Sequence, residues 1–277
     1  MNATVRLSYY HGITQSKTPE EVKDAVTAFA EVITANGGPQ ISVLPVVEIP
    51  QQIAMIVGGQ SEIALMNPLG YLFAHRQQNA VIPIAIAIRT TSGGTGPTYL
   101  SQVYANIASG INDVAGIRGR SLGFGLAVST SNFLVPAAEL RRRGVHPLTG
   151  PQKITFLGRH DQVAQAVYDG TVDAGAGHDG VLDDLTKKHP DAPQKVQRLF
   201  WSDPIPSDPV ATSVVEPALS QLRSAVVAAG KDPKGKAAIA TFWGTPSGLD
   251  AVDASAYEPL SGYLDALNLR MQDILPP

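Results

Sequence analysis

Short apolar strand patterns and amphipathic helix patterns alternate along this chain almost from its first residues. Residues 5–9 predict a strand, and apolar side chains at near-helical spacing predict a helix that begins at Thr18 and ends before Gly37. Thr18, Pro19 and Glu21 match a capping box with proline in the first turn. Such alternation is typical of proteins whose helices cover a largely parallel sheet, so the sequence predicts an α/β fold.

The same patterns predict most of the remaining elements. Further strands are expected at residues 41–47, 63–66, 81–88, 99–107, 121–125, 154–157, 172–176 and 210–215. Further helices are expected at residues 53–57, 132–143 and 160–168. Residues 67–70 predict a turn, residues 90–97 a loop, and residues 217–275 a mostly helical tail.

Two segments divide the predicted elements into two α/β lobes. The chain crosses to a second lobe near residue 98 and returns through the proline-rich residues 204–209. We therefore expect a discontinuous first lobe (1–97 plus 209–277) and an inserted second lobe (98–208), joined by a hinge of two crossing segments. The cleft between such lobes is the expected ligand site.

Composition excludes several classes of protein. The 44% hydrophobic and 16% charged residues allow a packed core, and a net charge of -3 does not favour a nucleic-acid surface. The absence of cysteine excludes disulfides, thiolate metal sites and a cysteine nucleophile. No apolar stretch reaches the roughly 20 residues of a membrane span. The first residues do not match a signal peptide, which leaves a cytoplasmic protein or an exported one whose leader has been removed.

The most specific feature is a run of hydroxyl side chains at Ser129, Thr130 and Ser131. It lies between a strand that ends at Gly125 and the helix predicted from residue 132. The first N–H groups of a helix lack intrahelical partners, and the helix dipole favours an anion beside them. These residues therefore suit a tetrahedral oxyanion, although a simple helix cap is an equally good interpretation of the run alone.

Charged residues near the expected cleft are further candidates. His160 opens a predicted helix and can donate to an anion, and Arg159 has the charge of an anion partner; both also fit a solvated surface. Asp208 lies on the return crossing. Its carboxylate would select a ligand that keeps a hydroxyl proton or carries a cationic group, unless Asp208 is only a turn residue before proline.

Polar residues also follow strands of the first lobe. Asn67 and Tyr71 come after a buried strand, where open α/β sheets bind ligands, and Tyr99 lies at the first crossing. Residues 172–179 hold Asp173 and His178 but lack the spacing of a known metal site. No nucleophile elbow, Walker loop or dinucleotide fingerprint is present, so neither an enzyme nor a cofactor is predicted.

Several stretches together resemble the phosphonate/phosphite/phosphate substrate-binding proteins of ABC transporters, a family of type II periplasmic binding proteins. Residues 129–136 resemble the signature Ser-Thr-Ser-Gly-Tyr-Leu-Val-Pro, with Asn and Phe at its fourth and fifth positions. Residues 158–161 and 170–176 resemble a Gly-Ser-His-Asp segment and a Val-Asp-Ala-Gly-Ala strand. Residues 204–209 resemble Pro-Ile-Pro-Asn-Asp, and residues 116–120 resemble Asp-Leu-Lys-Gly-Lys with glycine in place of the acid.

The resemblance implies a two-lobed solute-binding protein and not an enzyme. Residues 129–131 would hold the oxygens of a phosphonate, phosphite or phosphate, with His160, Asp208 and Tyr99 as further contacts. The implied partners are a small oxyanion and the membrane permease of an ABC transporter, and the implied protein is a periplasmic or extracytoplasmic monomer without a bound metal or cofactor. An extracytoplasmic sensory domain that signals by lobe closure is the alternative.

The chain also departs from the family pattern. Residues 47–51 lack a tyrosine that the family often carries there, and Leu126-Ala127 stands where Asp-Pro is usual. Residues 67–71 replace the turn Gly-Pro-Phe-Ser-Tyr. Tyr10 and His11, in an unusual first loop, are added as candidate contacts. These changes leave the anion-binding turn intact but leave open which substituent the ligand carries.

Overall fold

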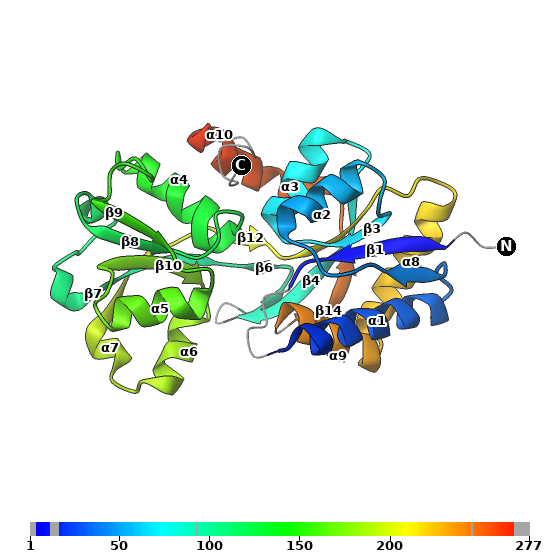
Figure 1. Ribbon diagram of the computed structural model, residues 1–277, viewed down its shortest axis with the longest axis horizontal. Coiled ribbons are helices and arrows are strands. Elements are labelled where there is room, and N and C mark those ends of the chain that lie inside the picture. Colours follow the sequence, from blue (N-terminus) through cyan, green and yellow to red (C-terminus); the bar gives the residue numbers. More distant parts are fainter. Residues whose placement is uncertain (1–3, 12–16, 92–93, 245, 269–277) are drawn as a thin grey trace. The chain divides into compact units, whose positions relative to one another are not determined.

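The computed structural model describes residues 4–11, 17–91, 94–244 and 246–268 (Figure 1). The chain divides into two compact units, Met1–Thr98 with Pro206–Glu258 and Tyr99–Ile205 with Pro259–Pro277. The sequence predicts that all of 209–277 belongs to the first lobe, whereas the segment after Glu258 groups with the second unit. Within the described residues, no helix is both long and apolar enough to cross a bilayer.

The first unit contains a seven-stranded sheet and five helices longer than one turn among its described residues. Its strands are β1 (Val5–Tyr9), β2 (Ile41–Val43), β3 (Ile63–Leu65), β4 (Ile82–Thr91), β5 (Gly94–Gly96), β13 (Pro209–Thr212) and β14 (Pro246–Ala251). Its helices are α1 (Pro19–Ala35), α2 (Ile49–Val57), α3 (Pro68–Gln77), α8 (Ala218–Lys231) and α9 (Pro233–Trp243), with a short 3-10 turn at Ala254–Tyr257.

The strand order of this sheet brings the carboxyl ends of several strands to the same edge. The order is β14-β4-β13-β3-β1-β2, with β5 paired to β4. Strand β1 runs parallel to β2 and β3, and β13 runs antiparallel to both β3 and β4. Strands β3 and β4 therefore run in the same direction, so the carboxyl ends of β1, β3 and β4 and the start of β13 meet at the same edge of the sheet.

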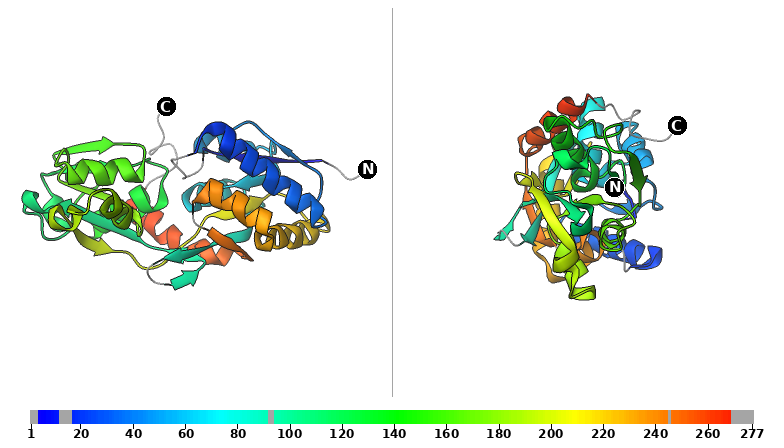
Figure 2. Two further views of the ribbon diagram at one scale, coloured as in Figure 1. Left: turned by 90° about the horizontal axis from the view of Figure 1, so that it is seen from below. Right: turned by 90° about the vertical axis from the view of Figure 1, so that its left-hand side faces the viewer.

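Helices cover both faces of the first sheet. Helices α1, α8 and α9 pack together on one face, and α2 and α3 pack against each other on the other (Figures 1 and 2). The predicted capping box is confirmed, because the Thr18 hydroxyl accepts from the Glu21 N–H and the Glu21 carboxylate accepts from the Thr18 N–H. Val26 and Ile33 lie on the buried face of α1, as the helical spacing predicts.

The second unit contains a five-stranded sheet, and a short two-stranded sheet joins the crossing segments. The larger sheet holds β7 (Ser101–Asn106), β8 (Ser121–Phe124), β9 (Lys153–Phe156), β10 (Ala174–His178) and β11 (Val196–Trp201), and the smaller one pairs β6 (Thr98–Tyr99) with β12 (Ile205–Pro206). The helices are α4 (Val135–Arg142), α5 (His160–Tyr168), α6 (Val181–Lys188), α7 (Ala192–Lys195) and α10 (Glu258–Leu267). Short 3-10 turns form at Ile107–Ser109 and Ala115–Ile117, and a π-helical turn forms at Thr130–Leu134.

The second sheet also gathers carboxyl ends at one edge. Its order is β11-β7-β10-β8-β9, and β8 runs parallel to both β9 and β10. Helices α5, α6 and α7 lie on one side of the sheet, and α4 lies on the other (Figure 1). Because β8, β9 and β10 end at the same edge, the segments that follow them lie together there: the hydroxyl run, the start of α5 and the turn after His178.

The structure corrects several element predictions. Residues 67–70, predicted to be a turn, are the N-cap and first turn of α3, because Asn67 caps the helix and Pro68 suits a first-turn position that needs no N–H donor. The loop predicted at residues 90–97 instead continues β4 to Thr91 and contains β5. The tail predicted to be mostly helical also contains β14.

The helix predicted from residue 132 begins earlier and in a different form. Its first turn, Thr130–Leu134, is π-helical, and α4 continues from Val135. Pro136 has no N–H to bond the carbonyl four residues earlier, so the regular α-helical register cannot extend back through this turn.

Candidate functional site

The hydroxyl run lies at the carboxyl edge of the second sheet. Ser129 is the N-cap of the π-helical turn, and its Oγ accepts from the Asn132 N–H at 3.2 Å. The Leu134 N–H donates to the Ser129 carbonyl at 3.0 Å, which closes the π-helical turn. Ser129 therefore does cap a helix, while Thr130 and Ser131, 2% and 3% exposed, lie in the turn that follows it.

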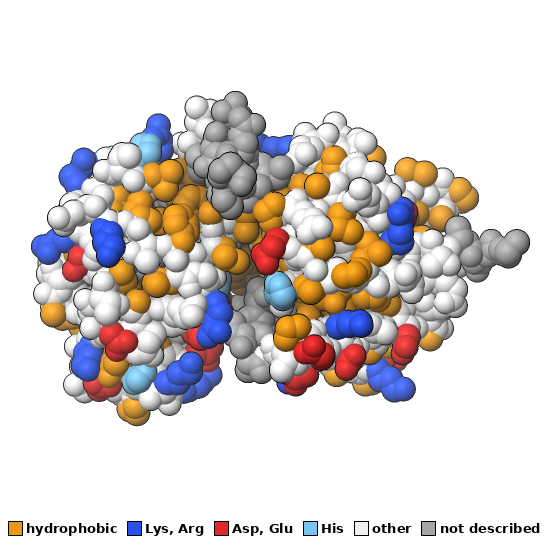
Figure 3. All heavy atoms as spheres, in the orientation of Figure 1, with side chains coloured by type: hydrophobic (Ala, Val, Ile, Leu, Met, Phe, Trp, Pro, Cys, Tyr) orange, Lys and Arg blue, Asp and Glu red, His pale blue; other side chains and the backbone are white. Residues whose placement is uncertain are grey.

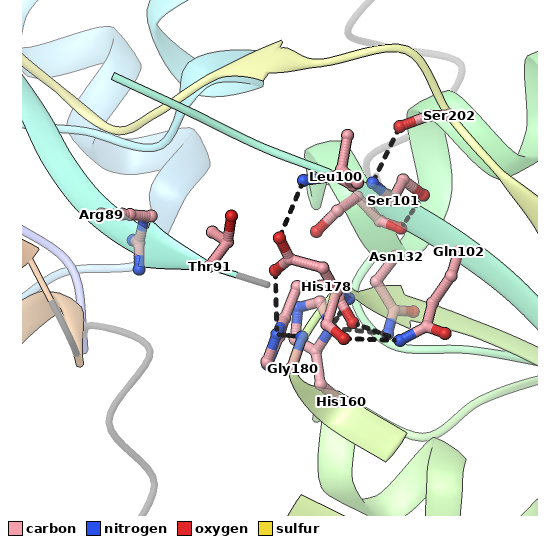
Figure 4. A network of polar contacts seen from close by, with 12 residues as sticks. Arg89, Thr91, Leu100, Ser101, Gln102, Asn132, His160, His178, Gly180 and Ser202 are labelled. Carbon is pink, nitrogen blue, oxygen red and sulfur yellow. Dashed lines mark hydrogen bonds and ion pairs between the residues drawn. The ribbon is translucent and has the colours of Figure 1, made fainter. Parts of the chain in front are cut away.

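Strand β7 is hydrogen-bonded to this turn. Ser101, at the start of β7, is fully buried, and its Oγ donates to the Ser131 carbonyl at 2.7 Å. The Ser101 N–H in turn donates to Ser202 Oγ at 2.8 Å (Figure 4). The main chain of the hydroxyl run is therefore held at the Ser131 carbonyl by a buried hydrogen bond.

Asn132 joins three segments of the second unit. It is fully buried, and its Oδ1 accepts from the N–H of Gly125, which directly follows β8. Its Nδ2 donates to the Ala176 carbonyl of β10 at 2.9 Å and lies 3.2 Å from Nδ1 of His160. A Cβ at position 125 would lie 2.8 Å from Cγ of Asn132, so only glycine lets this amide reach the strand end. The sequence pattern alone does not mark Asn132 as a site residue.

Two histidines lie side by side next to Asn132. His160 is the first residue of α5, His178 is the last residue of β10, and their ring centroids are 4.9 Å apart (Figure 4). The His178 N–H donates to His160 Nδ1 at 3.3 Å, and the Gly180 N–H donates to His178 Nδ1 at 3.1 Å. The predicted site residue His160 is thus placed beside the hydroxyl run, and His178 joins it without having been predicted to bind ligand.

Asp179 and Arg159 are further charged residues at the carboxyl edge of the second sheet. Asp179 is buried, and its Oδ2 accepts from the Leu100 N–H at 3.3 Å. Arg159 is exposed and forms an ion pair with Asp161 at 2.7 Å. The hydrogen bond that the Arg159 guanidinium donates to Asp161 raises the pKa of Arg159. Arg159 is therefore engaged locally at the surface, and its charge is balanced by its neighbour.

In the first unit, Asp208 is buried in an ion pair with Arg89. Asp208 directly precedes β13, and Arg89 lies near the carboxyl end of β4. Arg89 NH2 donates to Asp208 Oδ2, and Arg89 NH1 donates to the Trp243 carbonyl at 3.2 Å. Burial raises the pKa of Asp208, and the charge of Arg89 opposes that rise. The sequence predicts that this carboxylate selects a ligand with a hydroxyl proton or a cationic group, whereas in the structure its cationic partner is Arg89.

Other candidates of the first unit lie at the same edge but in different surroundings. Tyr10 follows β1 and packs edge-on against Phe242, with ring centroids 5.2 Å apart. His11 is exposed and lies 3.7 Å from the Glu48 carboxylate. Asn67 follows β3, and its Oδ1 caps α3 by accepting from the Gly70 N–H at 2.6 Å.

Tyr71 and Asp173 both contact other parts of their own unit. Tyr71 is fully buried against Tyr257 and stacks on His75, and burial raises the pKa of its phenol. Asp173 accepts two hydrogen bonds from Ser121, at 2.8 Å from the N–H and 2.7 Å from Oγ, which join the start of β8 to the segment before β10. The structure thus places Tyr71 in the core and Asp173 in a contact between two segments of the second unit.

Tyr99 is the last of the predicted site residues, and possible metal ligands are considered with it. Tyr99 lies in β6, in the first crossing segment, and is half-buried. No group of three or more His, Asp or Glu side chains that could hold a metal ion occurs within the described residues. Basic and acidic side chains lie interspersed on the face drawn in Figure 3 and do not form a basic patch there.

Comparisons with known proteins agree on one family. Residues 11–257 match the family described as ABC transporter, phosphonate, periplasmic substrate-binding protein. The chain is 22% identical over 205 residues to the phosphate-import protein PhnD of Mycolicibacterium smegmatis, covering 72% of this chain and 62% of that protein. The chain thus spans less than two thirds of the length of this curated relative.

Solved structures share the fold. PhnD1 of Prochlorococcus marinus, solved with methylphosphonate, has a TM-score of 0.74 at 17% identity and covers 96% of this chain and 98% of its own. A Xanthomonas citri protein solved with ATP has a TM-score of 0.75 at 19% identity and covers 99% of both chains. These similarities confirm the predicted two-unit α/β architecture of type II periplasmic binding proteins. Because the family match spans most of the sequence, the chain belongs to the periplasmic substrate-binding proteins of phosphonate ABC transporters.

Proposed function

We propose that this protein binds a small phosphorus oxyanion on Ser129, Thr130 and Ser131 and delivers it to the permease of an ABC transporter. The observation that carries the proposal is the braced hydroxyl run at the start of a helix, next to His160 and at the carboxyl edge of parallel strands. Hydroxyl and N–H donors in this arrangement suit a tetrahedral anion. The phosphate importer and the methylphosphonate complex among the similar proteins support the same ligand class.

The first unit supports a ligand without a cationic group. Its carboxylate at Asp208 is neutralised by Arg89, so it does not need an ammonium group as a partner. A phosphonate with a plain alkyl group, phosphite or phosphate then suits the protein better than an aminoalkylphosphonate. Tyr10, His11, Asn67 and Asp208 at the sheet edge of the first unit, together with Tyr99, are proposed as secondary contacts to the same ligand.

The proposal includes how the protein works. The two units rotate about the crossing segments near residues 98 and 206 when ligand binds, and the population shifts toward the ligand-bound arrangement. The protein acts as a monomer in an extracytoplasmic compartment, releases its ligand unchanged and needs no cofactor. Its membership in a family of periplasmic substrate-binding proteins supports the extracytoplasmic location.

Calorimetry with the purified protein tests the ligand class. Phosphate, phosphite, methylphosphonate, 2-aminoethylphosphonate, sulfate and ATP are titrated separately at one pH and ionic strength. We expect saturable binding of at least one of the first three, weaker binding of 2-aminoethylphosphonate, and recovery of each ligand unchanged by phosphorus NMR. Absence of binding by every phosphorus compound would overturn the proposal, and turnover of a ligand would replace it with an enzymatic function.

A further inference from the structure

Two backbone groups determine the orientation of the Asn132 carboxamide. The amide atom that faces the Gly125 N–H must accept, so it is the oxygen. The amide atom that lies 2.9 Å from the Ala176 carbonyl must donate, so it is the nitrogen. The usual ambiguity between the oxygen and nitrogen of an asparagine is therefore resolved by partners whose own roles cannot change.

The orientation of Asn132 determines which nitrogen of His160 carries the proton. The amide nitrogen, which can only donate, lies 3.2 Å from His160 Nδ1. The His178 backbone N–H, a second obligate donor, lies 3.3 Å from the same atom. Nδ1 must therefore accept, and a neutral imidazole that accepts through Nδ1 carries its proton on Nε2.

We propose that Asn132 is a positioning residue that holds His160 as the neutral Nε2–H tautomer, so that the ring donates one hydrogen bond to the bound oxyanion from Nε2. The second half of this inference rests on the proposed function. Asn132 directly follows Ser131, so one residue both ends the hydroxyl run and orients the ring beside it. A glycine at this position, as in the signature that residues 129–136 resemble, could not make these contacts.

The titratable groups around His160 allow this arrangement. His178 Nδ1 accepts from the Gly180 N–H, so His178 also carries its proton on Nε2 when neutral, and Asp179 Oδ1 lies 3.9 Å from this Nδ1. Asp161 is paired with Arg159. Each neighbour thus has its own partner, and the two donors on Nδ1 disfavour protonation of His160 at that atom.

Histidine side-chain NMR tests the tautomer directly. Two-bond nitrogen–proton correlation spectra of the full chain, labelled with nitrogen-15 at histidine, distinguish the two neutral tautomers. His75 is an internal reference of the opposite kind, because its Nδ1 lies 2.8 Å from the Val81 carbonyl, which can only accept. His146 is a reference of the same kind, because its Nδ1 accepts from the Leu148 and Thr149 N–H groups at 3.2 Å.

We expect His160 and His146 to show the Nε2–H pattern and His75 the Nδ1–H pattern, with His160→Gln assigning the resonance. In Asn132→Asp, a nearly isosteric change that keeps the acceptor for Gly125, the second carboxylate oxygen faces Nδ1 and draws a proton there. His160 alone should change its pattern. A wild-type His160 protonated on Nδ1 would overturn the inference, and so would an unchanged pattern in a folded Asn132→Asp variant.

Binding measurements separate the inference from the proposed function. With methylphosphonate and phosphate as probes, Asn132→Asp should weaken binding about tenfold or more, and His160→Ala should add little further loss in the Asn132→Asp background. Additive losses would show that Asn132 does not act through His160 and would overturn the inference while oxyanion binding stands. If no oxyanion binds the wild type, the proposed function fails, and the NMR spectra still decide the tautomer.

Discussion

Arg89 on β4 donates a hydrogen bond to the buried carboxylate of Asp208, a residue 119 positions away in the sequence. The side chains of Arg89 and Asp208 are only 11% and 7% exposed, so neither charge is well solvated once its partner is lost. Removing one member of a buried ion pair is far more costly than losing an exposed pair, because it leaves an uncompensated charge in the core.

Arg89→Met should therefore lower the free energy of unfolding by about 3–5 kcal/mol at pH 7, measured by urea denaturation. The loss should be smaller at pH 4. Without Arg89, burial alone raises the pKa of Asp208 in the folded state, while the unfolded carboxyl ionises near pH 3.9. The folded state then binds more protons, so stability falls as the pH rises above that value.

Arg223→Met is the matched control for this prediction. Arg223 pairs with Asp253 at 3.3 Å, and the Asp253 side chain is 78% exposed. Loss of such a surface pair should cost less than about 1 kcal/mol, and little of that cost should depend on pH between 4 and 7. If the free energy of unfolding falls equally in the two variants, the Arg89–Asp208 pair stabilises the fold no more than an exposed ion pair does.

The hydroxyls of Thr130 and Ser131 should contribute to binding more than to folding. Thr130→Ala with Ser131→Ala should weaken oxyanion binding by more than about tenfold, because two donors to a charged ligand are lost. Thr18→Ala is the control: it removes a helix N-cap of the first unit and should lower stability by about 1 kcal/mol without changing affinity. Calorimetry measures the affinity, and thermal denaturation measures the stability. Unchanged affinity in the double variant would show that the hydroxyl run only caps the helix.

Gly125 should tolerate no side chain, because Asn132 occupies the space. Gly125→Ala places a Cβ 2.8 Å from Cγ of Asn132 and should weaken ligand binding and lower the melting temperature. Gly262→Ala in α10 is the matched control, since a Cβ there would meet no neighbouring atom of the described residues within 4 Å, and alanine favours a helix. If the two substitutions have the same effect, the Gly125–Asn132 contact does not constrain the site.

Asp173 should matter for stability alone. Asp173→Ala removes the acceptor of two hydrogen bonds from Ser121 and should cost about 1–3 kcal/mol, because those donors lie in a partly buried position. Oxyanion affinity of the folded variant should not change. Asp113→Ala, which removes an exposed cap at the Gly116 N–H, should cost less. A selective loss of affinity in Asp173→Ala would instead place Asp173 in the binding site.

Local sequence signals predicted the elements that have clear periodicity and caps. Helix α1 shows both, and β1 and α5 have the bounds expected from the sequence. Helix α3 was missed because Pro68 through Ala74 are all buried, so no polar face reveals a helical period. Strand β14 was missed because its residues are typical of turns, and its pairing with β4, far away in the sequence, makes it a strand.

The candidate site was predictable where one segment carries it. The hydroxyl run and His160 stand out locally, but the role of Asn132 depends on Ala176, 44 residues away. Arg89 had a weak signal, since it is the first charged residue after the apolar run that begins at Val81. Its pairing with Asp208 could not be inferred from the sequence, because that contact depends on β13 lying beside β4 in the folded sheet.

Helix α10 changes what counts as a separable piece of this protein. The guanidinium of Arg142 on α4 lies over the ring of Tyr263 on α10, with 4.9 Å between its Cζ and the ring centroid. More than 100 residues separate these two residues in the sequence. A gene fragment that encodes only residues 99–205 would thus lack part of its own second unit. An autonomous version of that unit, for example as the sensing half of a split reporter, needs the α10 segment fused back onto it through a designed linker.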